Sequence, residues 1–281
     1  MKLAYSTNAY TQTDLASAIE SVAKLGFTGV EILCDRPHWF PGEVKTDEVA
    51  RIKTLLDKTG LQVSNLNANT SNGYFNPMPP ENVFEPALSS ANASWRDWRI
   101  AYTNNTIKLA REIGARCVSV TSGRPTPGTT PAIALNHFVE SLKRICEIAE
   151  KNDVRIGIEY EPGLLVERAN EVLEVIERVG SSKLGVNFDI GHSHLVAENP
   201  LLTTRALAGR IWNVHVEDIA GGKHFHLAPG DGTLPIAEYL RALRSIGYQN
   251  FLTVELYSYP EQPDAVGRRA ISHLQTLLDT L

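Results

Sequence analysis

The sequence predicts a single (β/α)₈ barrel of the α/β class that spans residues 1–281. Short apolar runs rich in β-branched residues alternate with longer helical patterns from one end of the chain to the other, which is typical of repeated βα units around a parallel sheet. Eight such runs are present, and closure into a barrel is the simplest arrangement for that number. A doubly wound sheet would place a glycine-rich phosphate turn after its first strand, and Tyr5-Ser6-Thr7-Asn8 is not such a turn.

The expected strands and helices follow one another in a regular order. The eight expected strands are residues 2–7, 29–34, 61–68, 117–123, 155–161, 184–192, 210–218 and 251–257. Helical patterns lie between them, for example over residues 14–25 and 94–113. A glycine ends several of these helices shortly before the next strand, at Gly26, Gly60, Gly114 and Gly247. No linker interrupts the pattern, so one domain is expected.

One connection, over about residues 69–93, is unusually long and contains a Pro79-Pro80 pair. It follows the third expected strand, so in a barrel it would lie over the catalytic face. Loops of this size inside a domain are commonly functional. A lid and an insertion without function both agree with the sequence.

Composition and charge exclude several classes of function. The balance of 43% hydrophobic and 21% charged residues is typical of a soluble globular protein. The net charge of -5, with basic residues scattered, argues against nucleic acid as a partner. The N-terminus lacks the apolar run of a signal peptide and no segment is predicted to span a membrane, so a cytoplasmic location is expected. The three cysteines lack CxxC spacing and are expected to be reduced thiols.

Charged or titratable residues interrupt four of the apolar strands. Because side chains alternate between the two faces of a strand, Glu159 and Glu161, Asp189, His215 and Glu255 are expected to point toward the barrel axis. Their apolar neighbours then face the helices. All of these residues lie near the C-terminal ends of their strands, the end where barrel enzymes place their active sites. His192 is expected to continue the end of the sixth strand.

Converging carboxylates at the mouth of a barrel predict a bound cation. Three carboxylates in one place repel one another and lose hydration, which costs several kcal/mol per ion unless something compensates. We therefore expect one divalent metal ion among Glu159, Asp189, His215 and Glu255. Oxygen-rich ligation with one imidazole and no thiolate suits Mn²⁺, Mg²⁺, Co²⁺ or Zn²⁺ without selecting among them.

At these residues the chain resembles the xylose isomerase-like TIM barrel superfamily of sugar phosphate isomerases and epimerases, which also includes inosose dehydratases and the endonuclease IV group. The resemblance covers essentially the whole chain and is most specific at Ile158-Glu159, residues 188–192, residues 213–218, residues 229–232 and Val254-Glu255. It implies that the matching Glu, Asp, His and Glu hold one divalent metal, and that His192 contacts the substrate.

The resemblance also favours Glu159 over Glu161 as the ligand on the fifth strand, leaving Glu161 as a residue beside the ligands, a substrate contact or a rim acid. The endonuclease branch fits less well, because its additional histidines on the third and fourth strands are replaced by residues 65–69 (Asn-Leu-Asn-Ala-Asn) and residues 119–122 (Ser-Val-Thr-Ser). A nuclease is therefore not expected.

The expected activity is that of a metal-dependent isomerase or epimerase acting on a sugar or a similar polyol or keto compound. Glu159 and Glu255 would serve as base and acid around a metal-stabilised enediolate. Transfer of the proton to the opposite face of the same carbon gives epimerisation, and transfer to the neighbouring carbon gives aldose–ketose isomerisation; the sequence does not choose. The expected substrate-binding residues are His192, Glu161, His226, Asn67 and Lys223.

Two alternatives remain open at this point. Loss of a β-hydroxyl from the same enediolate would make the enzyme an inosose or keto-sugar dehydratase, a lyase, with His192, Lys223, His224 or His226 as the acid. A sugar-binding barrel without catalysis could instead use exposed aromatic side chains to stack on sugars, namely Trp39, Tyr74, Phe75, Trp95 and Trp98, although Trp95 and Trp98 at helical spacing could simply pack. The absence of a basic cluster favours an unphosphorylated substrate, and the sequence is compatible with a homo-oligomer.

Overall fold

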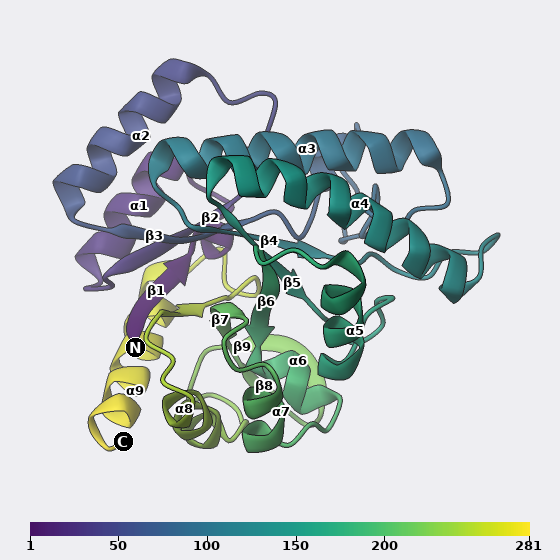
Figure 1. The fold of residues 1–281 in the computed structure, drawn as a ribbon. Helices are drawn as coiled ribbons and strands as arrows, with labels where there is room; N and C mark the ends of the chain where they lie inside the picture. The colour runs from purple at the N-terminus through teal and green to yellow at the C-terminus, as the bar shows by residue number, and fades with distance from the viewer.

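Eight parallel strands form a closed barrel in the computed structural model, which describes residues 1–281 (Figure 1). The ring order is β1-β10-β7-β6-β5-β4-β3-β2, so the last ring strand pairs with the first: Lys2 lies opposite Phe251. The ring strands are β1 (Lys2–Ser6), β2 (Gly29–Leu33), β3 (Gln62–Asn67), β4 (Cys117–Thr121), β5 (Arg155–Glu159), β6 (Leu184–Asp189), β7 (Ile211–Val216) and β10 (Phe251–Val254). The predicted barrel is confirmed.

Helices surround this ring and connect its strands. They are α1 (Leu15–Lys24), α2 (Thr46–Thr59), α3 (Ala93–Ile113), α4 (Pro131–Asn152), α5 (Ala169–Val179), α6 (Ile190–Leu195), α7 (Pro200–Ala206), α8 (Ile236–Ser245) and α9 (Pro263–Asp279), with the short 3₁₀ turns η1 (Thr7–Tyr10) and η2 (Asn72–Tyr74). The long helices α3 and α4 lie side by side (Figure 1). Gly60 and Gly114 take left-handed conformations at the ends of α2 and α3, as their positions after apolar helical patterns predict. No helix is both long enough and apolar enough to cross a membrane.

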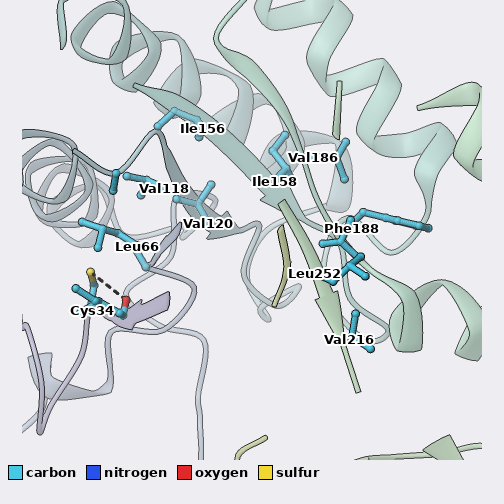
Figure 2. Close-up of a cluster of buried hydrophobic side chains, with 14 of the residues drawn as sticks. Cys34, Leu66, Val118, Val120, Ile156, Ile158, Val186, Phe188, Val216 and Leu252 are labelled. Carbon is cyan, nitrogen blue, oxygen red and sulfur yellow. Dashed lines mark hydrogen bonds between the residues drawn. The ribbon is translucent and has the colours of Figure 1, made fainter. Parts of the chain in front are cut away.

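The apolar layer between strands and helices consists of alternate strand residues. Figure 2 shows Val118 and Val120 of β4, Ile156 and Ile158 of β5, and Val186, Phe188, Val216 and Leu252 of the next strands in the ring. All of them are fully buried. Burying aliphatic side chains contributes roughly 25 cal/mol per Å² of apolar surface removed from water. The period of two that selects them also fixes what the opposite face of each strand carries.

The opposite face, inside the barrel, is polar and joined by hydrogen bonds. Asn65 donates to Ser119 Oγ at 2.9 Å, Asn213 donates to Asn187 Oδ1 at 2.9 Å, and Thr253 donates to Asn213 Oδ1 at 3.0 Å. All five residues are fully buried. Buried polar groups are tolerable when they are paired in this way, and such a network holds its members in fixed orientations. The barrel therefore carries a rigid polar floor beneath its C-terminal mouth.

Two features differ from the sequence prediction. The sixth strand ends at Asp189 and does not continue to His192, because the Asp189 carboxylate accepts a hydrogen bond from the His192 amide at 2.9 Å and starts the helix α6 there. Ile190 and His192 therefore lie in a helix. The second difference is an antiparallel hairpin, β8 (Asp218–Ala220) and β9 (Lys223–Leu227), in the connection after β7.

Candidate metal centre and active site

Four side chains meet at the C-terminal mouth of the barrel, and we call them the strand cluster: Glu159, Asp189, His215 and Glu255. Each offers a ligand atom, and these atoms all lie within 4.8 Å of one another. They belong to, or directly follow, β5, β6, β7 and β10, which are consecutive in the ring. All four are buried, with at most 2% of any residue exposed. Glu161, two residues beyond Glu159, is not one of the four.

His215 stands at the centre of this cluster. Its Nδ1 lies 3.1 Å from Glu159 Oε2 and 3.2 Å from Glu255 Oε2, and its Nε2 lies 2.7 Å from Oε2 of Glu31. An acceptor on Nε2 holds a proton there, so Nδ1 is the ring nitrogen that faces the cluster and would be available to a metal ion. Carboxylate–histidine pairs of this kind orient the histidine ligands of metal sites.

Asparagine amides from the N-terminal half of the chain hold the two glutamates. Asn69 donates to Glu159 Oε2 at 2.8 Å, while Asn67 and Asn8 donate to Glu255 Oε1 at 2.8 and 3.1 Å. Amides stabilise a carboxylate without neutralising its charge. The acids are therefore positioned by the half-barrel that faces them.

Burial and mutual repulsion set the ionisation of these groups. Burial, followed by the nearby charges of Glu217 and Glu159, raises the pKa of Asp189 well above its usual range. Burial likewise raises the pKa of Glu255. At Glu159 burial is the largest single influence, but the charges of His215 and His192 and the hydrogen bonds from His215 and Asn69 together outweigh it and lower the pKa to about 2. For His215, burial is outweighed by Glu159, Glu255 and Glu31, which raise its pKa. Acids of similar type thus differ in proton affinity, as catalytic pairs do.

The donor set fits a divalent cation. Asp189 uses Oδ1 to cap helix α6, while its Oδ2 is buried and has no hydrogen-bond partner. A buried carboxylate oxygen without a partner is costly, and a metal ion satisfies it. The four side chains supply three carboxylates and one imidazole without a thiolate, a set suited to hard or borderline divalent ions. The residues present therefore agree with the metal site that the sequence predicts.

A cavity of about 540 Å³ opens onto the strand cluster. Glu159 and Glu255 line it, together with Glu161, His192, His224 and His226. The predicted loop over residues 69–93 contributes a further part of the wall, from Asn69, Thr70, Asn72, Met78, Pro79, Pro80, Glu81, Asn82 and Phe84. Most of the residues that line the cavity have polar side chains, which suits a ligand rich in hydroxyl groups.

Comparison with known proteins identifies the family of this chain. The family model for the xylose isomerase-like TIM barrel matches residues 19–277. The chain belongs to this family. Among curated relatives of the xylose isomerase-like chain, the fructoselysine 3-epimerase of Shigella flexneri is 26% identical over 283 residues, covering 99% of this chain and 98% of the relative. A D-psicose 3-epimerase from Enterocloster bolteae is 31% identical over 121 residues, covering 42% of this chain and 38% of that enzyme.

Solved structures of xylose isomerase-like proteins superpose over the full length. A D-tagatose 3-epimerase-like protein has a TM-score of 0.82 at 25% identity and covers 100% of this chain and 99% of its own. The IolI protein, solved with a zinc atom, has a TM-score of 0.81 at 18% identity and covers 100% of this chain and 99% of its own. The second likeness concerns the fold.

Three of the five predicted substrate-binding residues line the cavity, and two do not. Glu161, His192 and His226 line the cavity, and burial followed by repulsion from Glu159 raises the pKa of Glu161 to about 8. Asn67 is fully buried and donates to Glu255 and Glu31. Lys223 is exposed and is not among the residues that line the cavity.

The aromatic residues considered for sugar stacking do not line the cavity of this xylose isomerase-like barrel. Trp39 is fully buried, contrary to its expected exposure, and donates from its indole nitrogen to Glu48 at 2.9 Å. Tyr74 and Trp98 pack against each other with ring centroids 4.6 Å apart, and Phe75 packs against Trp95 at 6.1 Å. They form a packed cluster between the long loop and α3 (Ala93–Ile113).

Sequence reasoning missed Glu31, which supports His215 from strand β2. Five ring strands, and not four, therefore carry an inward charged or titratable residue at or near their ends. The signal was present, since Glu31 interrupts the apolar run Gly29-Val30-Glu31-Ile32-Leu33 just as the ligand acids interrupt theirs. Glu31 is fully buried and also accepts hydrogen bonds from Asn65 and Asn67 at 2.8 and 3.1 Å.

Proposed function

We propose that this chain is a divalent-metal-dependent keto-sugar epimerase that removes and returns a proton at the carbon beside a carbonyl. The observation that most directly supports this proposal is the order in the barrel of the four strands that position the ligands. Glu159 and Glu255 stand on the two outer strands of four neighbours, β5 and β10, with Asp189 and His215 between them. Two carboxylates so placed can approach one substrate carbon from opposite sides. The full-length relatedness to fructoselysine 3-epimerases favours epimerisation over aldose–ketose isomerisation.

The strand cluster would hold the metal through Glu159, Asp189, His215 and Glu255. A bound divalent ion would polarise the substrate carbonyl and stabilise negative charge on its oxygen. The protein's own groups then move the proton. Glu159 and Glu255, on the two outer strands of the cluster, are placed so that one takes the proton from carbon and the other gives a proton to the opposite face. The product differs from the substrate only in configuration at that carbon, and the reverse reaction exchanges the two roles.

The substrate is a sugar or related polyol ketone without a phosphate group. The cavity wall has two arginines, Arg36 and Arg124, and Arg36 is already paired with Glu43 at 2.6 Å. Phosphate sites ordinarily offer several convergent donors. Glu161, His192 and His226 offer instead separate polar groups of the kind that bind hydroxyls. The loop over residues 69–93 would cover the bound sugar.

Solvent deuterium exchange tests the proposal. The protein, loaded with Mn²⁺, would be incubated in heavy water with ketohexoses and with ketose–amine conjugates, and deuterium at C3 would be followed by NMR and mass spectrometry. Deuterium uptake at C3 together with appearance of the C3 epimer supports the proposal. If sugars bind but none of them takes up deuterium, the proposal is overturned in favour of a sugar-binding barrel. Uptake with transfer of the carbonyl to the neighbouring carbon would identify an isomerase.

A dehydratase is the second candidate, and one observation favours it. His226 lies in the cavity wall, and although burial opposes its protonation, Glu217 raises its pKa to about 10. A protonated imidazole at this place could give its proton to a departing hydroxyl. The same incubations distinguish the two reactions, because dehydration yields a product lighter by one water molecule, whereas epimerisation leaves the mass in ordinary water unchanged.

A further inference from the structure

A second group of metal-ligating side chains lies at the edge of the barrel mouth, and we call it the rim cluster: His192, Glu217, His224 and His226. As in the strand cluster, the ligand atoms lie within 4.8 Å of one another. They come from helix α6, from the residue after β7, and from strand β9. Three imidazoles and one carboxylate form a different donor set from the three carboxylates and one imidazole of the strand cluster.

The hairpin that carries two of these histidines is built to present them on one side. Gly221 and Gly222 form its turn with φ values of 61° and 63°, a pair of left-handed residues that favours a tight two-residue connection. His224 and His226 are two residues apart on β9 and share a face. Phe225 between them is 57% exposed. The alternation therefore directs both imidazoles at the cavity and the phenyl ring at solvent.

Glu217 provides an independent sign of a missing partner. Its side chain continues the inward alternation of Asn213 and His215 and is fully buried. Its oxygens accept no hydrogen bond of good geometry, and only imidazoles stand beside them: His224 Nε2 lies 3.2 Å from Oε1, and His226 Nδ1 contacts Oε2. A carboxylate this deeply buried ordinarily accepts several hydrogen bonds or binds a cation.

The backbone makes room for this carboxylate. A Cβ atom on Gly191 would lie 2.2 Å from Glu217 Oε1, so only glycine in helix α6 permits the approach. His226, in addition, has a φ of 45°, which is uncommon for a residue other than glycine and frequent at ligand-binding positions. Both features hold the side chains of the rim cluster together at a conformational cost.

His192 is oriented as a metal ligand would be. Its Nδ1 lies 3.0 Å from the carbonyl oxygen of Tyr160, an arrangement that places the ring proton on Nδ1 and leaves a lone pair on Nε2. That Nε2 lies 3.1 Å from Nε2 of His224. In zinc sites the nitrogen that does not bind the metal commonly donates to a backbone carbonyl. Ligand bonds of about 2.1 Å separate tetrahedral ligands by roughly 3.4 Å, close to this spacing.

We propose that the rim cluster is a second divalent metal site, held by His192, His224 and His226 with Glu217. Three imidazoles select borderline ions such as Zn²⁺ or Co²⁺ over Mg²⁺. The site adjoins the strand cluster, since His192 Nδ1 lies 3.8 Å from Glu159 Oε1 and His226 Nδ1 lies 3.9 Å from Glu255 Oε2. The protein then binds two ions in one cavity.

Cobalt titration of the metal-free full-length protein tests this site directly. We expect the wild type to bind two equivalents of Co²⁺ by equilibrium dialysis, and one of the two to give the stronger visible absorption of a nitrogen-rich tetrahedral site. His224→Ala should bind one equivalent and lose that absorption. His194→Ala, which removes a histidine of α6 outside the rim cluster, is the matched control and should keep both. One equivalent in the wild type, or two in His224→Ala, would overturn the proposal.

A second variant guards against a folding defect and separates the two clusters. Glu217→Gln keeps the volume of the side chain and removes its charge, so circular dichroism should match the wild type while the second equivalent of Co²⁺ binds at least 10-fold more weakly, the loss expected when a charged ligand becomes neutral. Glu255→Gln should instead weaken the equivalent without the strong absorption. If Glu217→Gln leaves both affinities unchanged, the rim cluster does not bind metal. Each of these readouts is independent of any sugar.

Discussion

The two clusters at the barrel mouth lie on different kinds of structural element. The strand cluster stands on four neighbouring barrel strands over a hydrogen-bonded floor, and its residues are at most 2% exposed. The rim cluster takes two of its histidines from a hairpin with a double-glycine turn, and His224 and His226 are partly exposed. Sites on strands are held more precisely than sites on loops. We therefore expect the strand cluster to perform the chemistry and the rim cluster to tolerate more change.

The largest effect is expected from Glu255→Gln, which should impair the strand cluster and leave the rim cluster intact. Removing a group that transfers a proton should lower kcat for C3 exchange by about 10²- to 10⁴-fold, because an amide cannot take up or give the proton. The rim cluster should keep its equivalent of Co²⁺. Deuterium incorporation measured beside Glu261→Gln, an exposed acid after β10, checks the effect. Equal rates in the two variants would remove Glu255 from the mechanism.

Glu31→Gln separates support from ligation within the strand cluster. Glu31 accepts from His215 Nε2 at 2.7 Å, so the amide should weaken the orientation of the ring and lower Mn²⁺ affinity by about 10- to 100-fold. Isothermal titration gives the affinity, with Glu20→Gln on the exposed face of α1 as control. Unchanged affinity in Glu31→Gln would show that the network below His215 is structural only.

Glu161 lies between the clusters and should report on both through pH. Burial, then repulsion from Glu159, raises its pKa to about 8 in the folded protein, above the ordinary glutamate value of 4.5. A raised acid binds more protons folded than unfolded, so metal-free stability should fall as pH rises from about 4.5 to about 8 and then level off. Glu161→Gln should remove this fall. Urea unfolding at pH 5 and pH 8 measures the change in the free energy of unfolding. The same change in the wild type and in Glu161→Gln would contradict the raised pKa of Glu161.

Gly222→Ala should give the smallest effect and act on the rim cluster alone. Its φ of 63° costs an alanine about 1 kcal/mol, so the hairpin should open more often and the second equivalent of Co²⁺ should bind a few-fold more weakly. Affinity for the first equivalent and C3 exchange should stay at wild-type values. A loss shared by both clusters would mean that the hairpin also supports the strand cluster.

The difference between the clusters also explains what the sequence could predict. The period of two along an apolar strand determines which residues point inward, so Glu159, Asp189, His215 and Glu255 were predictable before any coordinates. Asp189 was placed correctly, yet its role as the N-cap that ends the strand was missed, and so His192 was assigned to a strand although it belongs to a helix.

The hairpin was harder to predict. Gly221-Gly222 between two short runs signals a turn, but the strands on either side, Asp218–Ala220 and Lys223–Leu227, are too short and too polar to stand out by periodicity. Which face of such a hairpin turns toward the barrel depends on tertiary packing, which no local pattern contains. The meeting of His192 with His224 was therefore visible only in the structure.

The amide contacts to the two glutamates have a consequence for assembly of the protein. The acids lie on β5 and after β10, whereas Asn8, Asn67 and Asn69 follow or end strands in the first half of the ring. The second half of the chain carries every proposed ligand, and the first half carries the amides and the Glu31 carboxylate that orient them. Metal affinity therefore reports closure of the ring: if the chain is divided at the helix-ending turn of Asp153, the C-terminal fragment should reach full affinity only when the N-terminal fragment is added.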